Sequence, residues 1–269
     1  MVQTVLLAHP RSFDLATVDS GDWRAALPVT NVQDMQPARV ARTTNLSNTF
    51  LVVEFTAAAA CNVAALIGTN LSASATIRIR GATSEADLTA APGYDSGSIS
   101  AWPGTGRPAD AGLTSWTAFK KWTNSTAYVW WRIDISDGSN GDGYVQIGRI
   151  ILAPAFQPTY GLSAGWSWQF NPADIQVRSP FGHVLTQERL RPRSLSFSLD
   201  FLSEAEWFDG VAELQRLRGL AGDLLCCLDA DATTYLHRRI IHGVLSEVMA
   251  FSQPHFALYA VRIGILELL

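Results

Sequence analysis

The stretch VWWRIDISDGSNGDGYVQIGRIIL, residues 129–152, decides the fold class. Apolar and polar residues alternate in its first run with the period of two that is typical of a strand with one buried face. A second apolar run, 144–152, follows a loop rich in glycine and acidic residues. The pattern therefore predicts two strands joined by a hairpin loop. The predicted inner face holds Trp131, Ile133 and Ile135, and the outer face holds Trp130, Arg132 and Asp134.

The acidic loop DGSNGDG, residues 137–143, invites comparison with a calcium-binding EF-hand. With Asp137 at ligand position 1, position 5 is Gly141 and position 12 is Gly148, where a bidentate Glu is required. Asn-Gly and Asp-Gly are turn dipeptides that accept positive φ. We therefore expect a hairpin connection without a metal site.

Three further short strands are predicted before this stretch, at residues 49–55, 62–68 and 75–81, and the two runs of the stretch itself cover 127–136 and 144–152. No convincing amphipathic helix interrupts them, and many short strands without helices indicate a β-sandwich. Residues 153–166, APAFQPTYGLSAGW, contain two prolines and two glycines and read as a linker. We therefore expect a β-sandwich domain over residues 1–157.

The sequence pattern of residues 158–269 differs from that of residues 1–157. The run 193–201 alternates strictly, and a helix is predicted directly after it over 203–218. Ser203 and Glu206 form a capping-box pattern at its start, and Gly219 can close its end. Strands are predicted at 223–229, 235–248 and 255–268. This second domain is expected to be a β domain with one helix.

Composition and charge exclude several classes of protein. The formal net charge is −4, and the two lysines, Lys120 and Lys121, form no basic stripe, so we expect no nucleic-acid recognition. The first residues lack a basic segment, and their apolar run is too short for a signal peptide or a membrane span. Cys61, Cys226 and Cys227 are odd in number and include a neighbouring pair, which favours a reducing compartment of synthesis.

The patterns of known catalytic sites do not fit this chain. GYDSG, residues 93–97, is spaced G-x-x-S-G and not as a nucleophile elbow. His237 and His242 are five apart on a predicted strand, so they point to opposite faces. No carboxylate pair and no phosphate-binding loop stand out. We expect no catalytic, cofactor-binding or metal-binding residues and no enzymatic activity.

The tryptophans allow two interpretations. Trp102, Trp116 and Trp122 are candidate glycan-binding residues, because an exposed aromatic ring offers an apolar platform to the face of a sugar. Alternatively, they close the ends of the sandwich, since burying a tryptophan removes a large apolar area from water. Sequence alone leaves both open.

Most of residues 20–152 resembles a known fold family. The segments GDWRAALPVTNVQDMQPARVARTTN, ALIGTNLS, YDSG, YVWWRIDISD and GYVQIGRIIL together resemble the galactose-binding-like (discoidin-type) jelly roll, in the version found in tail proteins of long-tailed bacteriophages. Residues 160–269 resemble the β-sandwich-plus-helix unit of phage tail tubes and distal tail proteins, although those proteins usually carry the two units in the opposite order.

The resemblance implies a structural virion protein of the phage tail tip, a distal tail or baseplate hub protein made in the host cytoplasm. It would form a ring, expected to be a hexamer, between the tail tube protein and the tail hub and fibre proteins, with a domain that contacts a host surface glycan. The alternative is a carbohydrate-binding receptor-recognition module, or adhesin, of a tail fibre or cell-surface protein.

The terminal strand supports the ring interpretation. Residues 256–265 are apolar on both predicted faces, which indicates that both faces are covered. A neighbouring subunit can supply such cover. The candidate interface residues are Tyr259, Val261, Ile263 and Ile265.

Overall fold

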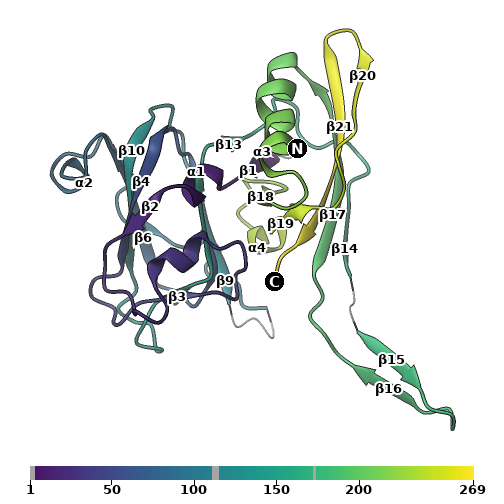
Figure 1. The fold of residues 1–269 in the computed structure, drawn as a ribbon, viewed down its shortest axis with the longest axis horizontal. Helices are drawn as coiled ribbons and strands as arrows, with labels where there is room; N and C mark the ends of the chain where they lie inside the picture. Colours follow the sequence, from purple (N-terminus) through teal and green to yellow (C-terminus); the bar gives the residue numbers. More distant parts are fainter. Residues whose placement is uncertain (1–3, 111–114, 172–173) are drawn as a thin grey trace.

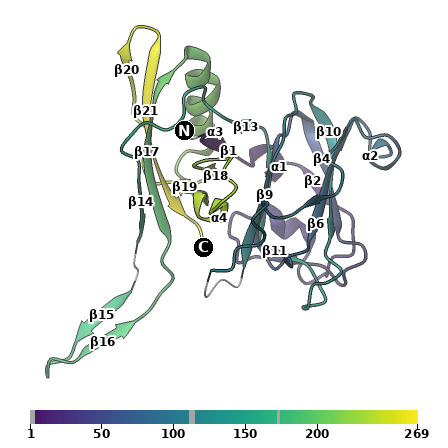
Figure 2. The same ribbon diagram turned by 180° about the vertical axis from the view of Figure 1, so that it is seen from behind.

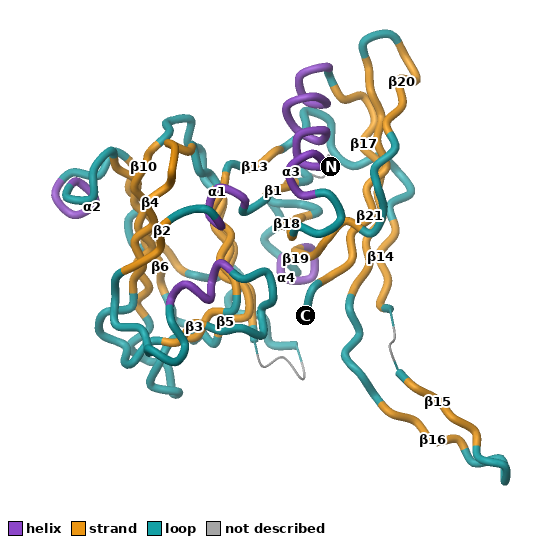
Figure 3. Tube along the Cα trace, in the orientation of Figure 1, coloured by secondary structure: helices purple, strands orange, loops and turns teal. Residues whose placement is uncertain are grey.

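A computed structural model describes residues 4–110, 115–171 and 174–269. The fold class is mainly β, as the sequence predicts, and three sheets lie roughly side by side as layers (Figure 1). A helix covers the third layer, and a two-stranded hairpin extends away from it (Figures 1 and 3).

The first two layers form the predicted N-terminal β-sandwich. The six-stranded sheet holds β2 (Thr17–Asp19), β4 (Phe50–Ala59), β10 (Tyr128–Ser136), β6 (Thr76–Ala82) and β7 (Tyr94–Asp95) in that order, with β8 (Ile99–Ser100) also paired to β6. The facing sheet holds β12 (Arg149–Ala153), β5 (Val63–Thr69) and β9 (Trp116–Lys121), and β3 (Ala41–Arg42) pairs with β11 (Gln146–Ile147) nearby. Short helices connect them: α1 (Arg11–Asp14), a 3₁₀ turn (Val29–Gln33) and α2 (Asp87–Ala90).

Strand β10, which contains Trp131, lies at the centre of the six-stranded sheet. Trp131 and Ile133 of β10 are fully buried between the two sheets, and Ile135 is nearly so, as the alternation predicts. On the outer face, the half-buried Trp130 packs against Leu88 of α2. The inner and outer faces predicted for this strand are therefore confirmed.

The predicted strand 144–152 is divided in the structure. β11 pairs with β3, and β12 pairs with β5. The break falls at Gly148, where an added Cβ would lie 2.3 Å from the carbonyl oxygen of Pro37. The chain bends at this position and passes close to Pro37. Only glycine fits there, because any side chain would meet the Pro37 carbonyl.

The third layer draws strands from both halves of the sequence. The eight-stranded sheet runs β13 (Ala155–Phe156), β1 (Leu6–Ala8), β18 (Asp223–Cys227), β19 (Ile240–Leu245), β21 (Leu258–Glu267), β17 (Arg193–Leu202) and β14 (Ser167–Phe170), with β20 (Phe251–His255) paired to β21. The N-terminal strand β1 thus pairs with β18, about 220 positions along the chain. The division into domains at residue 157 stays a prediction, and it does not separate the sheets.

The middle sheet is covered on both sides. In β5, Ala64 and Leu66 face the sandwich core, while Val63 and Ala65 pack against Leu225 and its neighbours in the third layer. A strand buried on both faces has a nearly continuous apolar sequence. This explains the run NVAALIG, which has no alternation.

The predicted helix is confirmed. A π-helical segment (Glu206–Ala212) continues into α3 (Glu213–Arg218). The Ser203 hydroxyl accepts the backbone N–H of Glu206, whose carboxylate in turn accepts the backbone N–H of Ser203 at 2.9 Å. Gly219 ends the helix with a φ of +52°. Val211 and Leu214 are buried against the sheet.

One other prediction for this region is wrong, and some strands were not predicted. Residues 235–248 do not form one strand, because α4 (Leu236–Arg239) precedes β19. The residues after the predicted linker are also ordered into strands: β14, then β15 (Ile175–Arg178) and β16 (Val184–Gln187). Within the part of the chain that the structure describes, no helix has the length and apolarity needed to cross a membrane.

Candidate functional site

The three tryptophans predicted as glycan platforms lie in different surroundings. Trp102 is only 2% exposed, and its indole N–H donates to the Ser72 carbonyl at 2.6 Å. Trp116 and Trp122 are half-buried. Arg107 stacks over the Trp116 ring at 4.1 Å, and Tyr94 stacks on Trp122 with ring centroids 5.6 Å apart.

No described contact joins two of these three rings. Trp102 is a core residue, so its assignment as a glycan platform is corrected. Ala101 and Trp102, which follow β8, lie in the sandwich core, which agrees with the alternative that this tryptophan is buried. The indole N–H of Trp116 donates to the Pro108 carbonyl at 2.9 Å, and that of Trp122 is buried, while Arg107 and Tyr94 lie against the faces of the two rings.

The four residues predicted as an oligomer interface also need correction. Val261, Ile263 and Ile265 of β21 are at most 2% exposed and pack inside the core beneath the helix. Tyr259 stacks on Trp207 of that helix, with centroids 4.8 Å apart. The chain's own helix supplies part of the cover that was expected from a second subunit.

The acidic loop 137–143 forms a tight hydrogen-bonded turn. The buried Asp137 carboxylate accepts from the backbone N–H of Ser72 and from the Asn140 amide. Asn70 donates to Asp142 at 2.8 Å and to the carbonyl of Tyr144 at 3.1 Å. The loop therefore holds Tyr144 in place at the end of the sandwich.

Tyr144 belongs to a cluster that sequence reasoning missed, here called the Arg–Tyr cluster: Arg24, Arg42, Tyr144 and Gln146. The guanidinium groups of Arg42 and Arg24 lie 4.2 and 5.6 Å from the Tyr144 ring centroid. Arg42 also donates to the Gln146 side-chain oxygen from Nε at 3.2 Å and Nη2 at 2.5 Å. Among the described residues, neither arginine forms an ion pair with a carboxylate.

Backbone pairing brings this cluster together. Gln146 of β11 lies opposite Arg42 of β3, and the Arg24 N–H donates to the Arg42 carbonyl at 2.9 Å. Arg24 is exposed, and the other three side chains are half-buried. The cluster thus offers fixed guanidinium donors, an aromatic ring and an amide to solvent. This combination can bind hydroxyl and carboxylate oxygens.

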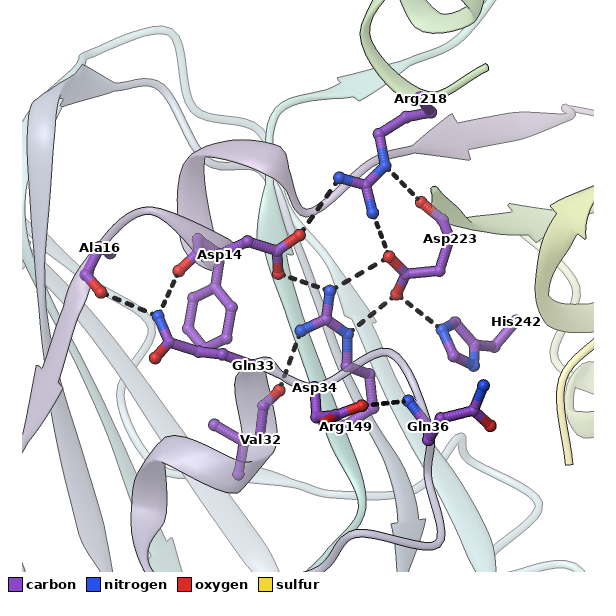
Figure 4. Close-up of polar contacts among 11 residues, drawn as sticks. Asp14, Ala16, Val32, Gln33, Asp34, Gln36, Arg149, Arg218, Asp223 and His242 are labelled. Atoms are coloured by element: carbon purple, nitrogen blue, oxygen red, sulfur yellow. Dashed lines mark hydrogen bonds and ion pairs between the residues drawn. The ribbon is translucent and has the colours of Figure 1, made fainter. Parts of the chain in front are cut away.

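A second polar cluster lies at the junction of the layers (Figure 4). Arg149 of β12 is fully buried and donates from Nε to Asp223 of β18 at 2.9 Å and from Nη2 to Asp14 of α1 at 2.5 Å. Arg218 at the end of α3 donates to both carboxylates, and the ring of His242 bonds Asp223 at 2.9 Å. The cluster links the sandwich to the third sheet.

The buried charges at this junction are neutralised by direct contacts between acidic and basic side chains. Burial alone would raise the pKa of Asp223, but the His242 hydrogen bond and the charge of Arg149 outweigh it and hold that pKa well below its usual range. For Asp14, burial outweighs Arg149 and raises the pKa. With every side chain engaged by another, the junction is a structural connection and not an open site.

The hairpin and a pocket are the remaining candidates. The hairpin β15–β16 with its turn, here called the arm (residues 174–188), has eight strand residues that are all exposed. Near the base of β14 lies a cavity of about 270 Å³, here called the aromatic pocket. It is lined by Trp166, Trp168, Leu228, Tyr235, Arg238 and Arg239. In the described ranges, no group of three His, Cys, Asp or Glu side chains could hold a metal ion.

Comparison with known proteins finds similarity only at the level of structure. No protein-family model and no curated protein sequence matches the chain. A family 32 carbohydrate-binding module from Clostridium perfringens, solved in complex with galactose, is 12% identical and covers 55% of this chain and 98% of its own, with a TM-score of 0.37.

Two further solved structures are similar to the same degree. Another such module, from a family 31 glycoside hydrolase of C. perfringens, is 4% identical and covers 54% of this chain and 96% of its own, with a TM-score of 0.36. A fucolectin from striped bass (Morone saxatilis) serum is 9% identical and covers 97% of this chain and 92% of its own, with a TM-score of 0.37.

Proposed function

We propose that the β-sandwich is a non-catalytic module that binds carbohydrate through the Arg–Tyr cluster. The observation that carries the proposal is the meeting of two arginines without carboxylate partners, a half-exposed tyrosine and an amide at one end of the sandwich. A sugar presents hydroxyl groups around a ring that has an apolar face. The cluster supplies planar donors for the hydroxyls and an aromatic ring beside them.

The positive charge of the Arg–Tyr cluster indicates which class of glycan it would bind. Guanidinium groups form their strongest hydrogen bonds with anionic oxygens. Arg24 and Arg42 lack such partners among the described residues, whereas Arg39 pairs with Asp34 and Arg78 with Asp95. A glycan that carries a carboxylate or sulfate group therefore suits the cluster better than a neutral one.

A glycan array followed by calorimetric titration with the best glycan tests this proposal. Arg42→Ala and Tyr144→Ala should each weaken binding at least about tenfold, the effect of losing about 1.4 kcal/mol. Arg39→Ala is the matched control, because that arginine is exposed in the same segment and outside the cluster. Full-strength binding by both cluster variants, or a wild-type chain that binds no glycan, would contradict the proposal.

We also propose that the chain is a structural protein that associates with copies of itself. The arm favours this second function, because Ile175, Val177 and Leu185 share one face of an unsupported hairpin and are 39–64% exposed. A lone two-stranded hairpin is marginally stable in water. A partner that covers the apolar face would stabilise it.

The assembly that we propose is the tail tip of a long-tailed bacteriophage, where a ring would join the tail tube to the hub and fibres. That placement rests on the sequence resemblance alone. The solution mass of the full chain, measured by mass photometry over a range of concentrations, tests the self-association. A chain that stays monomeric at every concentration would overturn it.

A further inference from the structure

We propose that the turn of the arm inserts Phe181 into the aromatic pocket of a second copy of this chain. The inference rests on the proposed self-association and identifies the two surfaces that meet. One is the turn 179–183, and the other is the pocket between β14 and α4.

The turn presents Phe181 rigidly to solvent. The Gly182 N–H donates to the Ser179 carbonyl at 2.9 Å, and the Ser179 N–H donates to the His183 carbonyl at 2.8 Å. Pro180 occupies the second position of this turn, where its fixed φ is favourable. Phe181 is 90% exposed at the outer end of the arm. An exposed aromatic side chain on a hydrogen-bonded turn is suited to fill a pocket of a partner.

The aromatic pocket is lined by exposed rings that the chain itself leaves uncovered. Trp166 is 40% exposed and Tyr235 is 64% exposed. Arg238 lies over the Tyr235 ring at 5.5 Å and is ion-paired with Asp110, so the aromatic wall is bordered by a neutralised guanidinium group. The indole N–H of Trp168 is buried and has no hydrogen-bond partner within the described residues. A backbone carbonyl of an entering turn could accept it.

The aromatic pocket is large enough for the Phe181 side chain. A cavity of about 150 Å³ is enough to hold a benzene molecule, so the pocket's volume of about 270 Å³ has room for a phenyl ring with part of its turn. Aromatic rings packed edge to face are attracted beyond the effect of the area they bury. The Trp and Tyr walls offer such contacts to Phe181.

The same chain cannot make this contact. The arm extends away from the body, and its tip lies far from α4 in both opposite views (Figures 1 and 2). Tip and pocket are different surfaces, so the contact between copies is heterologous. Such contacts close into a ring when the rotation between neighbours allows it.

Single variants of the full chain test each surface. Phe181→Ser should raise the dissociation constant at least about tenfold, because a buried phenyl ring is lost. Tyr235→Asn should do the same, and asparagine tolerates the left-handed backbone at this position, where φ is +53°. Phe256→Ser is the matched control, since Phe256 is 97% exposed but lies on the β20–β21 hairpin.

A mixture of the two variants tests the direction of the contact. Phe181→Ser keeps its pocket and Tyr235→Asn keeps its tip, so a mixture should form dimers although each variant alone is monomeric. Benzoylphenylalanine in place of Phe181 should photo-crosslink to Trp166, Trp168 or Tyr235, and isotope labelling of one chain should show that the product is intermolecular.

The outcomes separate the two proposals. A monomeric wild type removes the self-association and this inference with it. An oligomeric wild type whose mass is unchanged by Phe181→Ser, or whose crosslinks map elsewhere, overturns the tip-and-pocket contact and leaves self-association standing. Equal loss of assembly in Phe256→Ser would also contradict it.

Discussion

The central strand of the sandwich, β10, and the arm strand β15 share one sequence pattern and have opposite surroundings. Both alternate apolar with polar residues, as in Trp131-Arg132-Ile133 and Ile175-Gln176-Val177. In β10 the apolar face is fully buried against a second sheet, whereas in β15 all four residues are exposed. The pattern indicates that one face of the strand is covered, but it does not show whether the same chain or a partner covers it.

This difference distinguishes contacts made within the chain from contacts left for a partner. Removing a covered side chain should lower the free energy of unfolding, while removing an uncovered one should change association and leave stability intact. The expectations below test that distinction from the largest effect to the smallest.

Trp131→Ala should destabilise the chain most, by about 3–5 kcal/mol, the usual cost of deleting a large buried aromatic side chain. Trp102→Ala should now cost nearly as much, because that ring is buried and not in an exposed loop. Denaturant melts followed by tryptophan fluorescence and circular dichroism measure both. A loss below about 1 kcal/mol for either variant would place its ring outside the core.

Arg149→Met should cost about 3 kcal/mol, because it leaves the buried Asp223 without a main partner for its charge. The apolar methionine fills part of the space, so the loss reports mainly the Arg149 contacts to Asp223 and Asp14, although Arg218 and His242 still bond Asp223. Arg39→Met, on the surface, should change stability by about 0.5 kcal/mol or less. Equal melting curves for Arg149→Met and the wild type would contradict the role of the junction.

Val177→Ser on the arm should leave the free energy of unfolding within about 0.5 kcal/mol of the wild type. Its effect should appear in the solution mass instead, since it removes an apolar side chain from the face proposed to meet a partner. Gln176→Ser on the opposite face is the control. A melt shifted as far as that of a core variant would show that the arm is covered within its own chain.

The exposed pair of Arg78 and Asp95 should give the smallest effect. The Arg78 hydrogen bonds lower the pKa of Asp95 to about 2. A carboxyl group whose folded pKa is depressed stabilises the fold above its ordinary pKa and loses that contribution as pH falls. Melts of the wild type and Arg78→Ala should therefore differ by about 0.5 kcal/mol or less near neutral pH. The difference should vanish between about pH 4 and pH 2.

Local patterns predicted the local features well. Alternation placed the inner face of β10, and the Ser203–Glu206 capping box placed the helix, because both depend on residues a few positions apart. The arm also carried a readable signal, with a Pro-Phe-Gly turn between two short β-type runs. No strand was predicted there, because the strand predictions for the second half begin at residue 193.

No local sequence pattern indicated the Arg–Tyr cluster. Arg42 and Tyr144 are about a hundred positions apart, and only the pairing of β3 with β11 brings them together. Likewise, the sequence shows that residues 256–265 are apolar on both faces, but the helix of the same chain supplies part of the cover that was expected from a neighbour.

The sequence by itself determined the mainly β class, the long central strands of both halves, and the helix with its ends, since hydrogen-bond geometry and side-chain periodicity act over short distances. The tertiary structure alone decided which residues meet across the chain: β1 joined to β18, Arg149 to Asp223, and Arg42 to Tyr144. It also decided which apolar faces remain uncovered. Burial depends on the whole set of packed layers, and no local pattern contains that information.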